Sequence, residues 1–282
     1  MPRRALLAVL ALLALALAGC GVKGEPTGAV ESFPARAVDA SGTSVVVERA
    51  PTRIVSADPG ATAILRDVGL GDAVTEATAA TLGQAAAEPG TGLVIVPLAL
   101  DAAALAQLRN AAPDVPVFRY GADPLEEAPV TVAQLGLAVG RGPEAAAIAE
   151  RLAAGLAAVR EGLVGKPTVR TLVEGAGFAG FGPTSPAGVD VAAAGGENVL
   201  TADQLLDPAA ISGLGVDAWI SLDPGGSTLT ELRRLPELAA VPAIRDGRVL
   251  TLPRDGYPID AALPQALQAL ADDLRAAPVA SG

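Results

Sequence analysis

The residues that could do chemistry are few, and they exclude most catalytic and metal centres. The 282-residue chain has no histidine, so histidine-ligated metals, Ser-His-Asp triads and Cys-His pairs cannot form within it. The single cysteine, Cys20, excludes an internal disulfide. The two lysines that could serve as bases, Lys23 and Lys166, lie in a predicted tether and at the end of a predicted helix. We therefore predict that the chain is not an enzyme, holds no cofactor and binds no bare metal ion.

A glycine-rich stretch at residues 175–180 (GAGFAG) fits the G-x-G-x-x-G pattern of dinucleotide sites. That pattern works only where a helix begins at once and points its N-terminus at the pyrophosphate. Pro183 and Pro186 follow too closely for such a helix. We interpret the stretch as a flexible loop at the end of a strand.

Side chains suited to holding a ligand follow the predicted strands. In open α/β sheets, ligands bind beyond the carboxyl ends of the strands. The candidate ligand contacts are Asp58, Tyr120, Phe178, Phe181, Asp223, Arg254 and Tyr257. For the two phenylalanines, packing in a core is an equal alternative. The sequence thus predicts a binding cleft at these strand ends.

Strands alternate with helices in the pattern that predicts parallel βα units. Strands are expected over 45–47, 53–56, 93–96, 115–119, 168–173, 216–222 and 248–252. Helices are expected from Asp58-Pro59 to Gly69, and over 101–111, 189–194, 229–234 and 260–276. Between the two series, apolar residues spaced by three and four predict one helix over 143–163, about 30 Å long. The predicted fold is α/β, with two Rossmann-like βα lobes joined by one long backbone helix.

The charge and composition exclude nucleic acid as a partner. The formal charge is −11 and aromatic residues make up only 2% of the chain. A basic groove for phosphates and rings for base stacking are therefore both missing.

We expect the chain to be a monomer.

The N-terminus has the features of an export signal. Arg3 and Arg4 precede an uncharged run over 5–18, too short to span a bilayer. The sequence at 17–20 (LAGC) resembles a bacterial lipobox, which implies cleavage before Cys20 and attachment of lipid to it. Removing both arginines takes the formal charge to −13. We predict an exported protein, lipid-anchored at the outer face of the cell membrane or on its periplasmic side.

Three segments resemble the iron-siderophore, haem and cobalamin-binding family of ABC-transporter solute-binding proteins. They are 53–65 (RIVSADPGATAIL) with Gly69 and Gly71, 194–199 (AGGENV) and 235–249 (LPELAAVPAIRDGRV). The resemblance covers roughly residues 36–276. It implies two lobes bridged by a backbone helix, a ligand held between them, and a permease and an ATPase as partners. The predicted parts are a signal peptide (1–19), lipidated Cys20 with a flexible tether (20–40), a first lobe (41–140), a connecting helix (141–165) and a second lobe (166–282).

The chain departs from this family where one acidic residue on each lobe docks onto the permease. Gln84 and Ala209 fall where those acids are expected. Glu88 and Asp207 lie close by and are the candidates to replace them.

The ligand is not fixed by the sequence. A ferric siderophore is favoured, while cobalamin and haem remain open. Tyr120 or Tyr257 could ligate haem iron, and Arg119, Arg141 and Arg254 could hold an anionic siderophore. The alternative function is a non-transport interaction or sensor lipoprotein with the same fold. An extracellular hydrolase is disfavoured because no nucleophile is activated.

Overall fold

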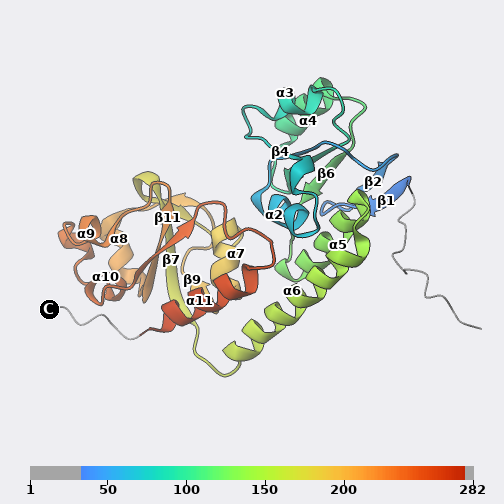
Figure 1. The fold of residues 1–282 in the computed structure, drawn as a ribbon. Helices are drawn as coiled ribbons and strands as arrows, with labels where there is room; N and C mark the ends of the chain where they lie inside the picture. The colour runs from blue at the N-terminus through green and yellow to red at the C-terminus, as the bar shows by residue number, and fades with distance from the viewer. Residues whose placement is uncertain (1–32, 277–282) are drawn as a thin grey trace, which may run out of the picture. The chain divides into compact units, whose positions relative to one another are not determined.

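Two separate sheets carry the predicted βα units (Figure 1). A computed structural model of the chain describes residues 33–276, so the predicted signal peptide and Cys20 lie outside it. The first sheet has four parallel strands in the order β4-β3-β5-β6. Its strands are β3 (Ile54–Ser56), β4 (Val74–Glu76), β5 (Leu93–Pro97) and β6 (Val117–Tyr120). β3 and the first four residues of β5 are buried, as expected for central strands of a parallel sheet.

The second sheet has the order β10-β8-β7-β11-β12, and β9 also pairs with β7. β7, β9, β11 and β12 are parallel. β8 pairs antiparallel with β7, and β10 pairs antiparallel with β8. Its strands are β7 (Val169–Gly175), β8 (Ala179–Phe181), β9 (Gly196–Asn198), β10 (Gln204–Leu205), β11 (Ala218–Asp223) and β12 (Val249–Pro253). The predicted fold class is therefore confirmed: two βα sheets lie on either side of one long helix along the chain.

The helices begin where capping residues and prolines allow. The α-helices are α2 (Pro59–Asp67), α3 (Leu82–Ala87), α4 (Ala102–Ala111), α5 (Ala128–Val139), α6 (Gly142–Leu163), α7 (Pro186–Ala193), α8 (Pro208–Ile211), α9 (Leu229–Leu232), α10 (Pro242–Arg245) and α11 (Leu263–Arg275). Short 3-10 turns are η1 (Gly71–Ala73), η2 (Leu125–Glu127), η3 (Ala176–Phe178), η4 (Ser212–Leu214) and η5 (Pro236–Leu238). Asp58, Asp101 and Ser185 each accept a backbone N–H at the start of a helix. The predicted start of a helix at Asp58-Pro59 is confirmed, with Asp58 as the N-cap and Pro59 in the first turn.

The long helix α6 has 22 residues and extends about 33 Å. It packs along α5 and along α11, which lies beside it in Figure 1. The contact with α11 is close at Gly155, where an added Cβ would lie 2.6 Å from the ring carbons of Pro264. The predicted rod is thus confirmed, and its position is fixed by a second helix.

Helix α11 is shared between two hydrophobic clusters. Leu263 and Leu267 are buried in the cluster that contains β3, β5, α2, α5 and α6. Leu270 and Leu274 are buried in a cluster of the second sheet. One helix therefore completes the apolar packing of both sheets.

Three local expectations are wrong. Residues 35–38 of the predicted tether form strand β1 (Ala35–Val38), which pairs antiparallel with β2 (Ser44–Val47). Helix α5 lies where no helix was expected. The glycine-rich loop at 175–180 is a tight hairpin, because β8 returns antiparallel along β7.

No helix among residues 33–276 is long and apolar enough to cross a membrane.

Candidate functional site

Asp58 follows β3 and closes the first turn of α2. Its Oδ1 accepts the backbone N–H of Ala61 at 2.9 Å. Burial raises the pKa of the Asp58 carboxyl, although the N–H groups of Ala61 and Gly60 oppose the rise. The carboxylate is thus occupied in capping a helix at the strand end.

Tyr120 ends β6, but its side chain does not face an open cleft. It is 1% exposed, and its hydroxyl donates a hydrogen bond to the carbonyl oxygen of Ile259 at 2.6 Å. Burial, followed by the charges of Asp58 and Asp260, raises its pKa well above the usual value. An added Cβ on Gly60 would lie 2.7 Å from the same Ile259 oxygen. Tyr120 and Gly60 therefore attach the segment after β12 to the first sheet.

Removing this hydroxyl is expected to weaken the attachment. The Tyr120→Phe substitution leaves a carbonyl at Ile259 without its donor in a buried place, and should lower the free energy of unfolding by about 1–2 kcal/mol. Urea unfolding followed by Trp219 fluorescence measures the loss. Tyr257→Phe is the control, because that half-buried hydroxyl makes no hydrogen bond to the described residues. Equal stabilities of the Tyr120→Phe variant and the parent would contradict this role.

Three of the predicted residues come together at the ends of the second sheet. The guanidinium carbon of Arg254 lies 5.7 Å from the centre of the Phe181 ring, a cation–π distance. The backbone N–H of Arg254 donates to the carbonyl oxygen of Asp223 at 3.0 Å. Arg254 and Asp223 are exposed and Phe181 is half-buried. These three side chains offer a guanidinium, a carboxylate and a ring edge to a ligand.

Phe178 belongs to the core rather than to this surface. Its ring meets the buried Trp219 edge-to-face, with centroids 6.4 Å apart. Its backbone has a positive φ of 59°, which the hairpin turn imposes. Of the two alternatives left open by the sequence, core packing describes Phe178.

Glu174 is a buried carboxylate that the sequence did not single out. It is 0% exposed and accepts from the backbone N–H of Ser227 at 2.8 Å and from the Ser227 hydroxyl at 3.0 Å. Trp219 Nε1 also donates to it at 3.4 Å. Burial raises its pKa, and these donors oppose the rise. Glu174 therefore holds the loop after Asp223 against the β7–β8 hairpin.

Tyr257 lies in the segment that also carries Arg254. Its backbone N–H donates to Oδ2 of Asp190 at 2.6 Å. Burial, then the charges of Asp190 and Asp273, raise the pKa of its phenol. Asp190 is 4% exposed, and burial raises its pKa to about 7. A carboxyl of α7 thus anchors the loop that bears two predicted ligand contacts.

The other candidate arginines are bound to the backbone. The guanidinium of Arg119 donates to the carbonyl oxygens of Leu98 and Leu100. Arg141 donates to those of Val68 and Gly140. Arg254 is the candidate arginine that is left exposed.

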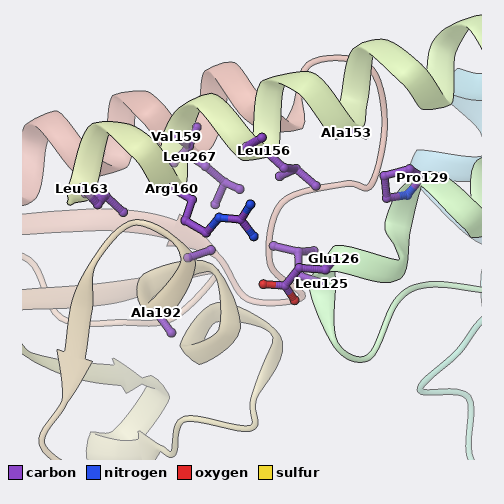
Figure 2. A pocket seen from close by; sticks show the side chains of 12 residues that line it. Leu125, Glu126, Pro129, Ala153, Leu156, Val159, Arg160, Leu163, Ala192 and Leu267 are labelled. Carbon is purple, nitrogen blue, oxygen red and sulfur yellow. The ribbon is translucent and has the colours of Figure 1, made fainter.

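A pocket of about 420 Å³ lies beside α6 (Figure 2). Its lining is mostly apolar, and Figure 2 shows the side chains of Arg160 and Glu126 pointing toward one another across it. The lining residues are Leu125, Glu126, Pro129, Ala153, Leu156, Ala157, Val159, Arg160, Leu163, Ala192, Ala193 and Leu267. None of the predicted ligand contacts lines it. With two charged groups and no hydroxyl or amide side chain, it offers little for selective recognition.

Comparison with solved structures identifies the fold. The periplasmic heme-binding protein RhuT from Roseiflexus sp. RS-1 aligns with a TM-score of 0.65 and 24% identity, over 79% of this chain and 97% of that one. Heme binding protein HmuT aligns with a TM-score of 0.65 and 19% identity, over 86% and 90%. An ABC transporter solute binding protein from Sulfurospirillum deleyianum aligns with a TM-score of 0.66 and 14% identity, over 86% and 88%. The chain has the solute-binding-protein fold.

No protein-family model and no curated protein matches the chain. The structural neighbours are named as binding proteins rather than as enzymes, as the sequence predicts for this chain. In residues 33–276 of this solute-binding fold, no group of three His, Cys, Asp or Glu residues could hold a metal ion.

The candidate docking acids of the solute-binding fold are both on the surface. Glu88 follows α3 and is paired with Arg53, whose Nη2 lies 2.7 Å from Oε2. Asp207 is exposed and caps α8 by accepting the N–H of Ala209 at 3.0 Å. Gln84 and Ala209 are exposed as well. One candidate acid is thus partly neutralised, and the other is engaged at a helix start.

Proposed function

We propose that this chain is an extracytoplasmic substrate-binding lipoprotein of an ABC importer. It captures a bulky chelate between the two lobes and delivers it to a permease and its ATPase. The observation that carries the proposal is the fold: two βα sheets joined by the single helix α6, at TM-scores of 0.65–0.66 to solute-binding proteins. Lipidation of Cys20 and a division into two lobes, with a first lobe that begins at β1 and a second lobe at 166–282, are parts of the same proposal.

The ligand brings its own complete coordination sphere. The chain has no histidine, and its one methionine is Met1. Tyr120 is buried and bonded, and the raised pKa of the Tyr257 phenol disfavours the phenolate that would bind iron. This favours a preformed chelate, such as a ferric siderophore or cobalamin, over haem held through its iron.

The charges at the strand ends favour an uncharged or cationic chelate. Asp58 follows β3, Asp223 ends β11, and Asp255 and Asp260 lie in the loop after β12, where Arg254 is the cation. Carboxylates repel an anionic ligand and raise the local concentration of a cationic one. A ferric hydroxamate or a cobalamin therefore suits this site better than a ferric catecholate.

A titration of Trp219 fluorescence tests the proposal. Trp219 is fully buried, so a coloured chelate quenches it by energy transfer without touching it. We expect saturable one-to-one quenching by a ferric hydroxamate or a cobalamin. The Phe181→Ala and Arg254→Ala substitutions should each weaken binding about tenfold, by removing the ring and the N–H donors of the guanidinium, respectively.

Arg109→Ala is the matched control, since Arg109 is an exposed arginine in the last turn of α4. It should bind as the parent does. No saturable response to hydroxamates, catecholates, haemin or cobalamins would overturn the proposal.

A second candidate function is an interaction or sensor lipoprotein with the same fold. The observation that favours it is the pair of expected docking positions occupied by Gln84 and Ala209. Affinity capture from cross-linked membranes separates the two: a permease–ATPase pair supports transport, and its loss in a Glu88→Gln, Asp207→Asn double variant locates the docking.

A further inference from the structure

Exposed apolar side chains gather at one place on the described surface. The large apolar side chains that are well exposed are Val38 (47%), Val130 (53%), Leu137 (41%), Val164 (79%) and Leu205 (79%). Val130 and Leu137 are seven residues apart on α5, two turns along the same face. Val38 belongs to β1, which packs against α5 (Figure 1). Three of the five exposed side chains therefore share one surface.

A hydrogen bond fixes this arrangement. The side-chain oxygen of Gln134, which lies between Val130 and Leu137 on α5, accepts the backbone N–H of Val38 at 2.8 Å. Arg36 is exposed on the same face of β1 as Val38, because side chains alternate along a strand. We call Arg36, Val38, Val130 and Leu137 the α5 patch. It combines apolar side chains with one cation.

The sequence of α5 is unusual for a helix with an exposed face. Its 12 residues (APVTVAQLGLAV) include no charged side chain. A soluble helix normally carries charges on its outer side, and a helix that is apolar all round is normally covered. The outer side of α5 therefore lacks the partner that its composition requires.

The path of the chain favours one partner. Cys20 is separated from Phe33 by 13 peptide units, and β1 begins two residues after Phe33. A segment of this length spans at most about 45 Å. A lipid on Cys20 therefore keeps β1, and with it the α5 patch, close to the bilayer.

We propose that the α5 patch rests on the lipid surface of the membrane that anchors the protein. This inference rests on the lipid anchor in the proposed function. Val38, Val130 and Leu137 enter the boundary between head groups and acyl chains, and the Arg36 guanidinium pairs with lipid phosphate. The contact gives the protein a fixed orientation on the membrane.

Site-specific fluorescence on the full lipidated chain tests this. Lipidation consumes the thiol of Cys20, so a cysteine introduced elsewhere is the one reactive thiol. Val130→Cys and Leu137→Cys carry an environment-sensitive nitrobenzoxadiazole label, and Leu205→Cys, which is more exposed, is the matched control. The proteins are reconstituted into phosphatidylcholine–phosphatidylglycerol vesicles with and without nitroxide-labelled lipid.

The labels at residues 130 and 137 should shift to the blue on vesicles and be quenched by nitroxide lipid about twofold or more above the label at 205. Arg36→Gln should reduce that quenching. Equal quenching at all three positions overturns the proposal, as does a protein that fails to float with the vesicles. A blue shift already present without lipid shows that a second copy covers the patch, and it also overturns the proposal. Chelate titration of the same variants reports separately on ligand capture.

Discussion

Replacing Gly155 with alanine should lower the free energy of unfolding by about 1–3 kcal/mol, the usual cost of overpacking. The added Cβ would lie 2.6 Å from two ring carbons of Pro264. Real carbon atoms do not approach so closely, and a proline ring cannot turn aside. Helices α6 and α11 must therefore separate, which disturbs both clusters that α11 completes. Urea unfolding followed by Trp219 fluorescence measures the effect.

The same substitution at Gly162 is the matched control. Gly162 lies on the same helix, but its added Cβ would meet only Gln268 Oε1 at 3.8 Å, an ordinary contact. Gly162→Ala should therefore stabilise the protein by up to about 1 kcal/mol through helix propensity. Opposite signs at the two positions support close packing of α6 on α11. A stabilising Gly155→Ala would contradict it.

The Asp190→Asn substitution should remove a large pH dependence of stability. Burial raises the folded-state pKa of Asp190 from 3.8 to about 7. Between these pH values the folded chain holds a proton that the unfolded chain has lost, so raising the pH favours unfolding. The parent should lose about 2–3 kcal/mol through Asp190 between pH 5 and pH 8, at about 1.4 kcal/mol per pH unit up to the folded pKa.

Asparagine imitates the protonated carboxyl and still accepts the Tyr257 N–H through its carbonyl oxygen. The variant should match the parent near pH 4 and exceed it at pH 8. Asp58 and Glu174 also have raised pKa values and contribute with the same sign, so the difference between the two pH profiles isolates Asp190. Parallel profiles would contradict a buried, proton-holding Asp190.

Local sequence patterns predicted the helices whose sequence signal lies within their own residues. Asp58-Pro59 marks the start of α2, and the spacing of apolar residues over 143–163 marks α6. Helix α5 was not predicted, because its outer positions are apolar as well as its inner ones. Its sequence therefore shows no periodic alternation of apolar and polar residues. Strand β1 escaped because four residues become a strand only when β2 pairs with them. The start of α7 at Ser185-Pro186 carried a cap and proline signal that could have been used.

The candidate site was predicted in part. Asp223, Arg254 and Phe181 were identified because they lie at the ends of predicted strands, and the structure brings them together. It could not separate side chains that face outward from those that face inward. Tyr120 is turned into the core by its bond to Ile259, a residue 139 positions away. The buried carboxylates Glu174 and Asp190 were missed because their importance comes from loops distant in sequence.

The division of α11 between two clusters has a consequence for biosynthesis. Leu263 and Leu267 belong to the core of the first sheet, although they are made more than 200 residues after β3. A nascent chain leaving the ribosome therefore cannot complete the core beside its first sheet until Leu267 has emerged. Truncation before α11 should therefore unfold the first sheet together with the second sheet.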